Sequence, residues 1–376
     1  MKKFHVLTTA LAAAAFLAGC GGNDSSDDQA PRTNFTQVVS FGDSLSDVGT
    51  YNVGVVAAAG GGHYSINGVG ATGLPHINWT EFLASTLLLS QPCAAETGLD
   101  TLPVAPGYAP VPHTFHDTAT TGNCTNYAQG GARVTDPHGP GNVYYFNPSD
   151  PTTAGNAIGQ LTVPVQTQIQ TYLADHNGTF TSDQLVTVFA GGNDIFINVG
   201  GVNAGLETPT QAVGAMTLAG AQLAGYVNAQ ILAKGAAHVV VITLPDVSLT
   251  PYAIGAGPAA QALVKQMTVA FNTELQKDLT AGASLLVVDA FSASEDQAAH
   301  PGNYGLSDVT HPTCTSSSSL ICTKSTLIAA VAPASAAAPA TAANGYQYAD
   351  SVHPTPFAYS LLASLVAENL ALRGWL

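Results

Sequence analysis

Short runs of apolar residues alternate along this chain with longer segments whose apolar positions recur at helical spacing. Four runs rich in β-branched residues predict buried strands, at residues 38–41, 185–190, 238–244 and 285–289. Five segments predict helices, at residues 77–89, 160–176, 208–234, 258–279 and 356–373. Such alternation is typical of an α/β fold, in which helices cover both faces of a parallel sheet.

The stretches between these elements predict long loops. Residues 52–75 are rich in glycine, residues 91–123 in proline, threonine and histidine, and residues 292–348 in serine, alanine and proline. We expect irregular structure there, and we expect loops at about 52–76, 91–123 and 301–348 to shape the ligand pocket. No fixed period repeats and no central linker interrupts the alternation, so the sequence predicts one domain over residues 35–376.

The first 20 residues have the pattern of an export signal. Lys2 and Lys3 precede an apolar stretch over residues 6–18, which is too short for a membrane span of about 20 residues. The residues 17–20, Leu-Ala-Gly-Cys, resemble the lipobox of bacterial lipoproteins. This resemblance implies that Cys20 is lipidated, and Gly21 after it implies the outer membrane of a Gram-negative cell; a cleaved, secreted protein is the alternative. Residues 21–34 are expected to form a disordered tether.

Export makes disulfide bonds possible, since they persist in oxidising compartments. Four cysteines remain besides Cys20, and they allow three pairings: Cys93, Cys124, Cys314 and Cys322. Proximity in the sequence favours Cys93 with Cys124 and Cys314 with Cys322. The chain has no C-x-x-C or H-E-x-x-H spacing, so we expect no metal site.

The formal net charge is −15 at pH 7. An acidic surface of this kind repels nucleic acid and anionic lipid headgroups. The composition therefore excludes nucleic-acid binding, and we expect membrane contact only through the N-terminal lipid anchor.

A serine follows the first predicted strand directly, in Gly42-Asp43-Ser44. Ligand crevices of open α/β sheets lie outside the carboxyl ends of the strands, so Ser44 there can meet a substrate; a helix-capping serine is the alternative. Three later segments favour a reactive Ser44 over a helix-capping one. Residues 126–132 contain two adjacent glycines that let a ligand approach the backbone closely, and residues 185–194 form a strand that ends in a glycine turn with Asn193. The third segment, residues 350–355, is Asp-Ser-Val-His-Pro-Thr.

With these four segments in this order, the chain resembles the SGNH, or GDSL, family of serine hydrolases. Further similar segments extend the resemblance from about Phe35 to the end of the chain, at residues 78–83, 244–247, 270–272 and 287–289. The resemblance implies a flavodoxin-like three-layer α/β/α sandwich. It also implies hydrolysis of carboxylic esters without a cofactor. The motif G-x-S-x-G is absent around Ser44, which argues against the α/β-hydrolase family.

A serine hydroxyl is a poor nucleophile until a base takes its proton, and His353 is the candidate base for Ser44. Asp350, three residues earlier, can orient the imidazole. The pattern Asp-x-x-His-Pro-Thr also occurs at Asp308 and His311. We favour His353, because it directly precedes the last predicted helix, where the family places its histidine, whereas His311 lies in a loop rich in cysteine and serine.

The resemblance also assigns an oxyanion hole to the backbone N–H groups of Ser44 and Gly131 and the side-chain amide of Asn193. Gly130 is the alternative to Gly131. Four further residues can line an acyl pocket, with core packing as the alternative for each: Tyr51, Tyr64, Ile66 and Phe196. The family also contains acyltransferases and polysaccharide deacetylases, and a surface lipoprotein that only binds ligands is a third alternative to an esterase or lipase.

Overall fold

The computed structural model describes residues 33–99, 111–118, 122–140 and 162–376. The predicted export signal, Cys20 and most of the expected tether lie outside the described residues. The residues from Arg32 onward belong to one unit, and this unit contains every element discussed below.

Four parallel strands form the central sheet. They are β1 (Gln37–Gly42), β6 (Gln184–Phe189), β7 (His238–Ile242) and β8 (Leu285–Val288), hydrogen-bonded in the order β1-β6-β7-β8. All six residues of β6 are buried, which explains why its sequence is a continuous rather than an alternating apolar run. The four predicted strands are thus confirmed.

A short fifth segment extends the sheet beyond β1. The Ser40 N–H donates to the Thr125 carbonyl at 3.0 Å, and the Tyr127 N–H donates to the Ser40 carbonyl at 2.8 Å. This parallel bridge places residues 125–127, second in chain order, next to the first strand. The resulting order, 2-1-3-4-5, is the flavodoxin-like arrangement, so the predicted fold class is confirmed.

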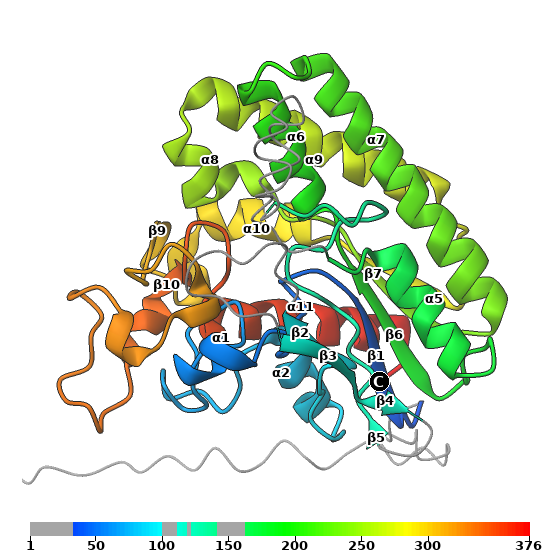
Figure 1. Cartoon of the computed structure of the whole chain (residues 1–376), viewed down its shortest axis with the longest axis horizontal. Coiled ribbons are helices and arrows are strands. Elements are labelled where there is room, and N and C mark those ends of the chain that lie inside the picture. The colour runs from blue at the N-terminus through cyan, green and yellow to red at the C-terminus, as the bar shows by residue number, and fades with distance from the viewer. Residues whose placement is uncertain (1–32, 100–110, 119–121, 141–161) are drawn as a thin grey trace, which may run out of the picture. The chain divides into compact units, whose positions relative to one another are not determined.

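Helices cover both faces of the sheet (Figure 1). One layer contains α2 (Trp79–Thr86) and α11 (Pro356–Arg373), which pack on each other. The other contains α5 (Val165–Asp175), α7 (Pro209–Tyr226) and α9 (Pro258–Asp278). The sequence predicted the bounds of α11 well because Thr355 caps its first turn and Gly374, at φ 76°, ends it.

Several elements differ from the sequence prediction. Helix α6 (Gly192–Asn203) was not predicted, and the segment predicted to be irregular contains α10 (Ala290–Ala299) and the paired strands β9 (Asp308–Pro312) and β10 (Tyr346–Tyr348). Only two residues of α10 are buried, so it lacks the apolar stripe that predicts a helix. The helix predicted over residues 208–234 leaves α geometry after Tyr226, where a π turn and a 3₁₀ turn follow.

The loop predicted at residues 91–123 also contains strands. It forms the hairpin of β2 (Glu96–Leu99) with β3 (Val111–Phe115) and the smaller pair β4 (Asp117–Thr118) and β5 (Gly122–Asn123). No described residue of β2 or β3 belongs to the main hydrophobic core, and such short strands leave little hydrophobic pattern in a sequence. The short helices are α1 (Gly54–Ala58), α8 (Pro251–Gly255) and 3₁₀ turns at Val247–Leu249, Pro301–Tyr304, Ser319–Ile321, Lys324–Thr326 and Thr341–Gly345.

Two disulfide bonds are formed among the described residues, Cys93 with Cys124 and Cys314 with Cys322. This is the pairing that sequence proximity favoured.

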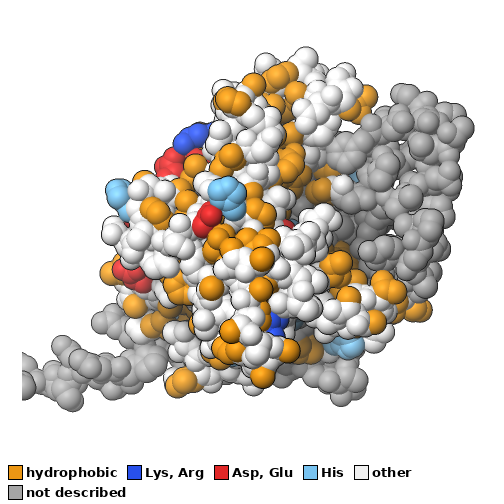
Figure 2. Space-filling view, turned by 90° about the vertical axis from the view of Figure 1, so that its left-hand side faces the viewer, with side chains coloured by type: hydrophobic (Ala, Val, Ile, Leu, Met, Phe, Trp, Pro, Cys, Tyr) orange, Lys and Arg blue, Asp and Glu red, His pale blue; other side chains and the backbone are white. Residues whose placement is uncertain are grey.

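No helix of the described part of the chain is both long and apolar enough to cross a membrane. The face shown in Figure 2 carries few charged side chains, in keeping with 9% charged residues in the sequence, and apolar and neutral groups interleave across it.

The helices α7 and α9 approach closely at Gly220. A Cβ atom added there would lie 2.5 Å from the Phe271 carbonyl oxygen and 3.1 Å from the Leu275 nitrogen. Gly214, on the same helix, has no atom within 4 Å of the corresponding position and is exposed.

The contact predicts opposite effects of the same substitution at these two glycines. Gly220→Ala should lower the free energy of unfolding by about 1–3 kcal/mol, because backbone of α9 must move to admit the methyl group. Gly214→Ala should raise it by about 0.5–1 kcal/mol, because alanine favours the helix. Urea denaturation measures both, and a Gly220→Ala protein as stable as Gly214→Ala would contradict the close approach.

Candidate active site

The end of β1 presents Ser44 in a rigid turn. Gly42 has no room for a side chain, since a Cβ atom there would lie 2.3 Å from the Phe189 carbonyl oxygen of β6. Gln168 of α5 fixes the same backbone, accepting from the Gly42 N–H at 2.9 Å and donating to its carbonyl at 2.8 Å. The Asp43 carboxylate then accepts from the Leu45 N–H at 3.0 Å and closes the turn around Ser44.

Asp43 is buried beside Ser44, and burial raises the pKa of its carboxyl to about 7 although the Leu45 N–H opposes the shift. Asp43 is no candidate for a chemical role, because its contacts are those of a residue that braces the turn.

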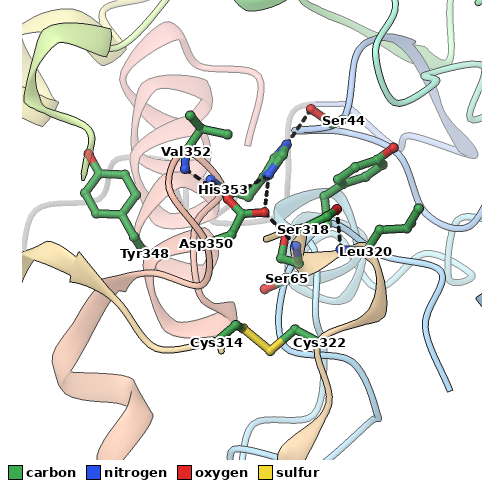
Figure 3. Close-up of polar contacts among 12 residues, drawn as sticks. Ser44, Ser65, Cys314, Ser318, Leu320, Cys322, Tyr348, Asp350, Val352 and His353 are labelled. Atoms are coloured by element: carbon green, nitrogen blue, oxygen red, sulfur yellow. Dashed lines mark hydrogen bonds and ion pairs between the residues drawn. A yellow bond between two sulfur atoms is a disulfide. The ribbon is translucent and has the colours of Figure 1, made fainter. Parts of the chain in front are cut away.

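Ser44, His353 and Asp350 form a continuous chain of hydrogen bonds (Figure 3). The Ser44 Oγ lies 2.8 Å from His353 Nε2, and His353 Nδ1 lies 2.8 Å from Asp350 Oδ2. An ionised carboxylate can only accept, so Nδ1 carries the ring proton and Nε2 is free to accept the proton of the Ser44 hydroxyl. The arrangement can thus generate an alkoxide nucleophile at Ser44.

The Asp350 carboxylate accepts hydrogen bonds from three backbone donors. These are the N–H groups of Ser319 at 2.7 Å, Val352 at 2.9 Å and His353 at 2.8 Å. Burial by itself would raise the pKa of this carboxyl, but the His353 ring and these hydrogen bonds hold the pKa well below its usual range.

The repeated motif at Asp308 and His311 lies elsewhere. It adopts a similar local turn on β9, with His311 Nδ1 2.9 Å from Asp308 Oδ2. The His311 side chain is 72% exposed, against 13% for His353, and its contacts are with Asp308 and Thr310. The structure therefore brings His353, and not His311, to Ser44.

The segment of residues 126–132 is held in place by hydrogen bonds to residues near Ser44. The Gly130 N–H donates to Asp47 Oδ2 at 2.9 Å and is therefore engaged within the protein. Gly131 follows at φ +82°, and the Asn193 Nδ2 donates to the Ala132 carbonyl at 2.8 Å. An amide NH₂ has two hydrogens, so Asn193 retains one for a ligand.

A comparison with protein-family models matches residues 38–366 to GDSL-like Lipase/Acylhydrolase. The chain belongs to this family. A search of curated proteins found no match. Family membership indicates an acylhydrolase, an enzyme that acts on ester bonds. The described residues contain no group of three or more His, Cys, Asp or Glu side chains that could hold a metal ion.

A cavity of the acylhydrolase opens beside Ser44 and His353. Most of its lining is apolar and comes from the carboxyl ends of β6 and β7 and from α6, α10 and α11, including Phe189, Phe196, Leu244, Ala293, Ala358, Leu362 and Leu365. The expectation that three loops shape the pocket was wrong for the described residues of 52–76 and 91–123. Of the described residues in those loops, only Gln347 and Tyr348 line this cavity, because the short segments after the strands and the N-terminal half of α11 already enclose it.

Of the four residues predicted either to line an acyl pocket or to pack in the core, some do the first and some the second. Phe196 lines the cavity, whereas Tyr51 and Ile66 are buried in packing. Tyr64 contacts the site in a different way, since its ring centroid lies 4.7 Å from that of His353. Gly130 admits this ring, because a Cβ atom there would lie 2.2 Å from it.

Two residues that support the site were not found from the sequence. Gln168 fixes the end of β1, and a polar residue beside Ile169 on the buried face of α5 was a signal that could have indicated it. Ser319 donates to Asp350 through its backbone, and a main-chain donor leaves no signature in a sequence.

Proposed function

We propose that this acylhydrolase cleaves carboxylic esters through an acyl intermediate on Ser44. The observation that carries the proposal is the continuous hydrogen-bond chain from Asp350 through His353 to Ser44. Asp350 fixes the tautomer of His353 and stabilises the imidazolium that forms when His353 takes a proton. The N–H groups of Ser44 and Gly131 and the amide of Asn193 would bind the oxyanion.

The reaction proceeds in two halves. Ser44 Oγ attacks the acyl carbon while its proton passes to His353 Nε2, and the bond from the acyl carbon to the alcohol oxygen then breaks as the alcohol takes that proton. Water attacks the acyl carbon in the second half and gives a proton to His353. The bond to Ser44 Oγ then breaks, Ser44 regains the proton and the carboxylic acid leaves.

The apolar cavity supports an ester with a hydrocarbon acyl group. Ala358, Leu362 and Leu365 line it at positions i, i+4 and i+7 of α11, a stretch of about 10 Å along one helix face. An acyl chain of several carbons can therefore lie along α11, removed from water.

Hydrolysis of p-nitrophenyl esters from acetate to palmitate tests the proposal, with the Ser44→Ala protein as the blank. We expect turnover that requires Ser44 and rises from acetate toward longer acyl chains. Absence of turnover, together with failure of a fluorophosphonate probe to label Ser44, would favour a binding lipoprotein. Labelling of Ser44 without hydrolysis would favour an acyltransferase or a polysaccharide deacetylase, which product analysis with added alcohols or acetylated glycans distinguishes.

We also propose export and attachment to the outer membrane through a lipid on Cys20. Two disulfide bonds support an oxidising compartment, and the sequence of residues 1–20 supports processing at the cysteine. The mass of the mature N-terminal peptide tests this: a diacylglycerol-modified Cys20 is expected, and an unmodified N-terminus beyond Cys20 would contradict it.

A further inference from the structure

The Asp350 carboxylate receives one hydrogen bond from a distant part of the chain. Val352 and His353 belong to the same turn as Asp350, but Ser319 lies 31 residues earlier and donates the shortest of the three bonds, at 2.7 Å. Ser319 begins a 3₁₀ turn inside the loop that the Cys314–Cys322 disulfide closes. Figure 3 shows this disulfide, with Ser318 and Leu320 of the same loop labelled.

This loop, residues 314–322, is anchored at both of its ends, at Cys314 on the Asp350 turn and at Cys322 on the side chain of Asn67. The Cys314 N–H donates to the Ala349 carbonyl at 2.8 Å, one residue before Asp350. The buried amide of Asn67 donates to the carbonyls of Ser319 and Cys322, both at 3.0 Å. The disulfide joins these two anchored ends, so the Ser319 N–H is held facing the carboxylate.

The repeated motif at Asp308 supplies an internal comparison. Asp308 Oδ1 accepts from the N–H groups of Thr310 and His311, both at 2.9 Å, much as Asp350 Oδ1 accepts from the two residues of its own turn. No described residue outside that turn donates to Asp308, whereas Ser319 donates to Asp350. The donor from the 314–322 loop therefore distinguishes the buried pair beside Ser44 from the exposed pair on β9.

We propose that the Ser319 N–H, held by the disulfide-closed loop, positions the Asp350 carboxylate for catalysis. Ser319 is a positioning residue: it acts through Asp350, which keeps the His353 ring aimed at Ser44. The inference rests on the proposed function of these three residues. It also gives the Cys314–Cys322 disulfide a role in the rate of the reaction, beyond stability.

The backbone, and not the hydroxyl, is the group that acts. The Ser319 Oγ is buried and has no hydrogen-bond partner among the described residues. Ser319→Ala therefore keeps the N–H that acts on Asp350, and it serves as the reference protein. Lactic acid is the hydroxy-acid counterpart of alanine, so lactic acid at position 319 differs from Ser319→Ala only by an ester oxygen in place of the N–H.

The pair of proteins isolates one hydrogen bond. We expect the lactic-acid protein to have a kcat roughly 10- to 100-fold below that of Ser319→Ala, from the usual contribution of a hydrogen bond to a charged group. KM for p-nitrophenyl esters should stay the same, because Ser319 does not line the cavity. The proton NMR resonance of His353 Nδ1–H should also shift, which a purely structural role would not cause. Equal kcat in the two proteins would overturn the proposal.

A second variant covers the case in which the ester-containing chain does not fold. Cys314→Ala combined with Cys322→Ala frees the loop and should lower kcat by roughly 10-fold at unchanged KM, and wild-type kcat in a folded double variant would overturn the proposal. Failure of the proposed function is distinguishable, because the unmodified protein would then show no turnover that depends on Ser44.

Discussion

Replacing His353 with alanine should lower kcat for ester hydrolysis by about 10⁶-fold, the usual loss when a serine hydrolase lacks its base. His353 Nε2 lies 2.8 Å from the Ser44 Oγ, and no other described histidine contacts that oxygen. Without the imidazole, the Ser44 hydroxyl stays protonated at neutral pH and cannot attack an ester efficiently. Initial rates on p-nitrophenyl esters, corrected with the Ser44→Ala blank, measure the effect.

The matched control is His311→Ala, which changes the same residue type in the same hexapeptide pattern. His311 is 72% exposed and bonds to its own aspartate and to Thr310, so kcat should remain that of the unmodified protein. A large loss in His311→Ala with activity retained in His353→Ala would assign the base to the other motif and contradict the site described here.

The sequence distinguished these two motifs through their surroundings rather than through their residues. The two local turns are similar, because Asp-x-x-His lets an aspartate accept from the backbone two and three residues later at both places. The two motifs differ in long-range contacts: only the one at Asp350 and His353 is buried, reaches the Ser44 hydroxyl and receives the Ser319 N–H. A following amphipathic helix in the sequence can indicate the burial. A backbone donor from another loop cannot be predicted from the sequence.

The fold was predictable where burial leaves a pattern. The strands of the sheet and the helices α5, α9 and α11 pack against the core, so their apolar positions recur with the period of the element. Helix α10 and the hairpin of β2 with β3 lie largely outside that core, and their polar composition was interpreted as loop. The lining of the pocket was predicted in the loops for a related reason. Most of it consists of apolar residues of helices and strand ends, and a sequence does not distinguish these from core residues.

The second large effect is expected at Asn193. Asn193→Ala should lower kcat by about 10²- to 10³-fold with little change in KM, the typical cost of removing one oxyanion-hole donor. The Asn193 amide lies at the start of α6 and lines the cavity, and its bond to the Ala132 carbonyl at 2.8 Å fixes the direction of its second hydrogen. In the proposed oxyanion hole that hydrogen would stabilise charge that develops only in the transition state, so KM should change little.

Asn198→Ala provides the matched control on the same helix. Asn198 is buried, donates to the Asp194 carbonyl at 2.7 Å and does not line the cavity. Its removal should lower the free energy of unfolding while leaving kcat unchanged, because it weakens α6 without removing a donor from the site. Equal losses of kcat in the two variants would mean that α6 stability, and not the Asn193 amide, limits the reaction. A loss confined to Asn193→Ala would support the proposed role of the Asn193 amide as an oxyanion donor beside Ser44.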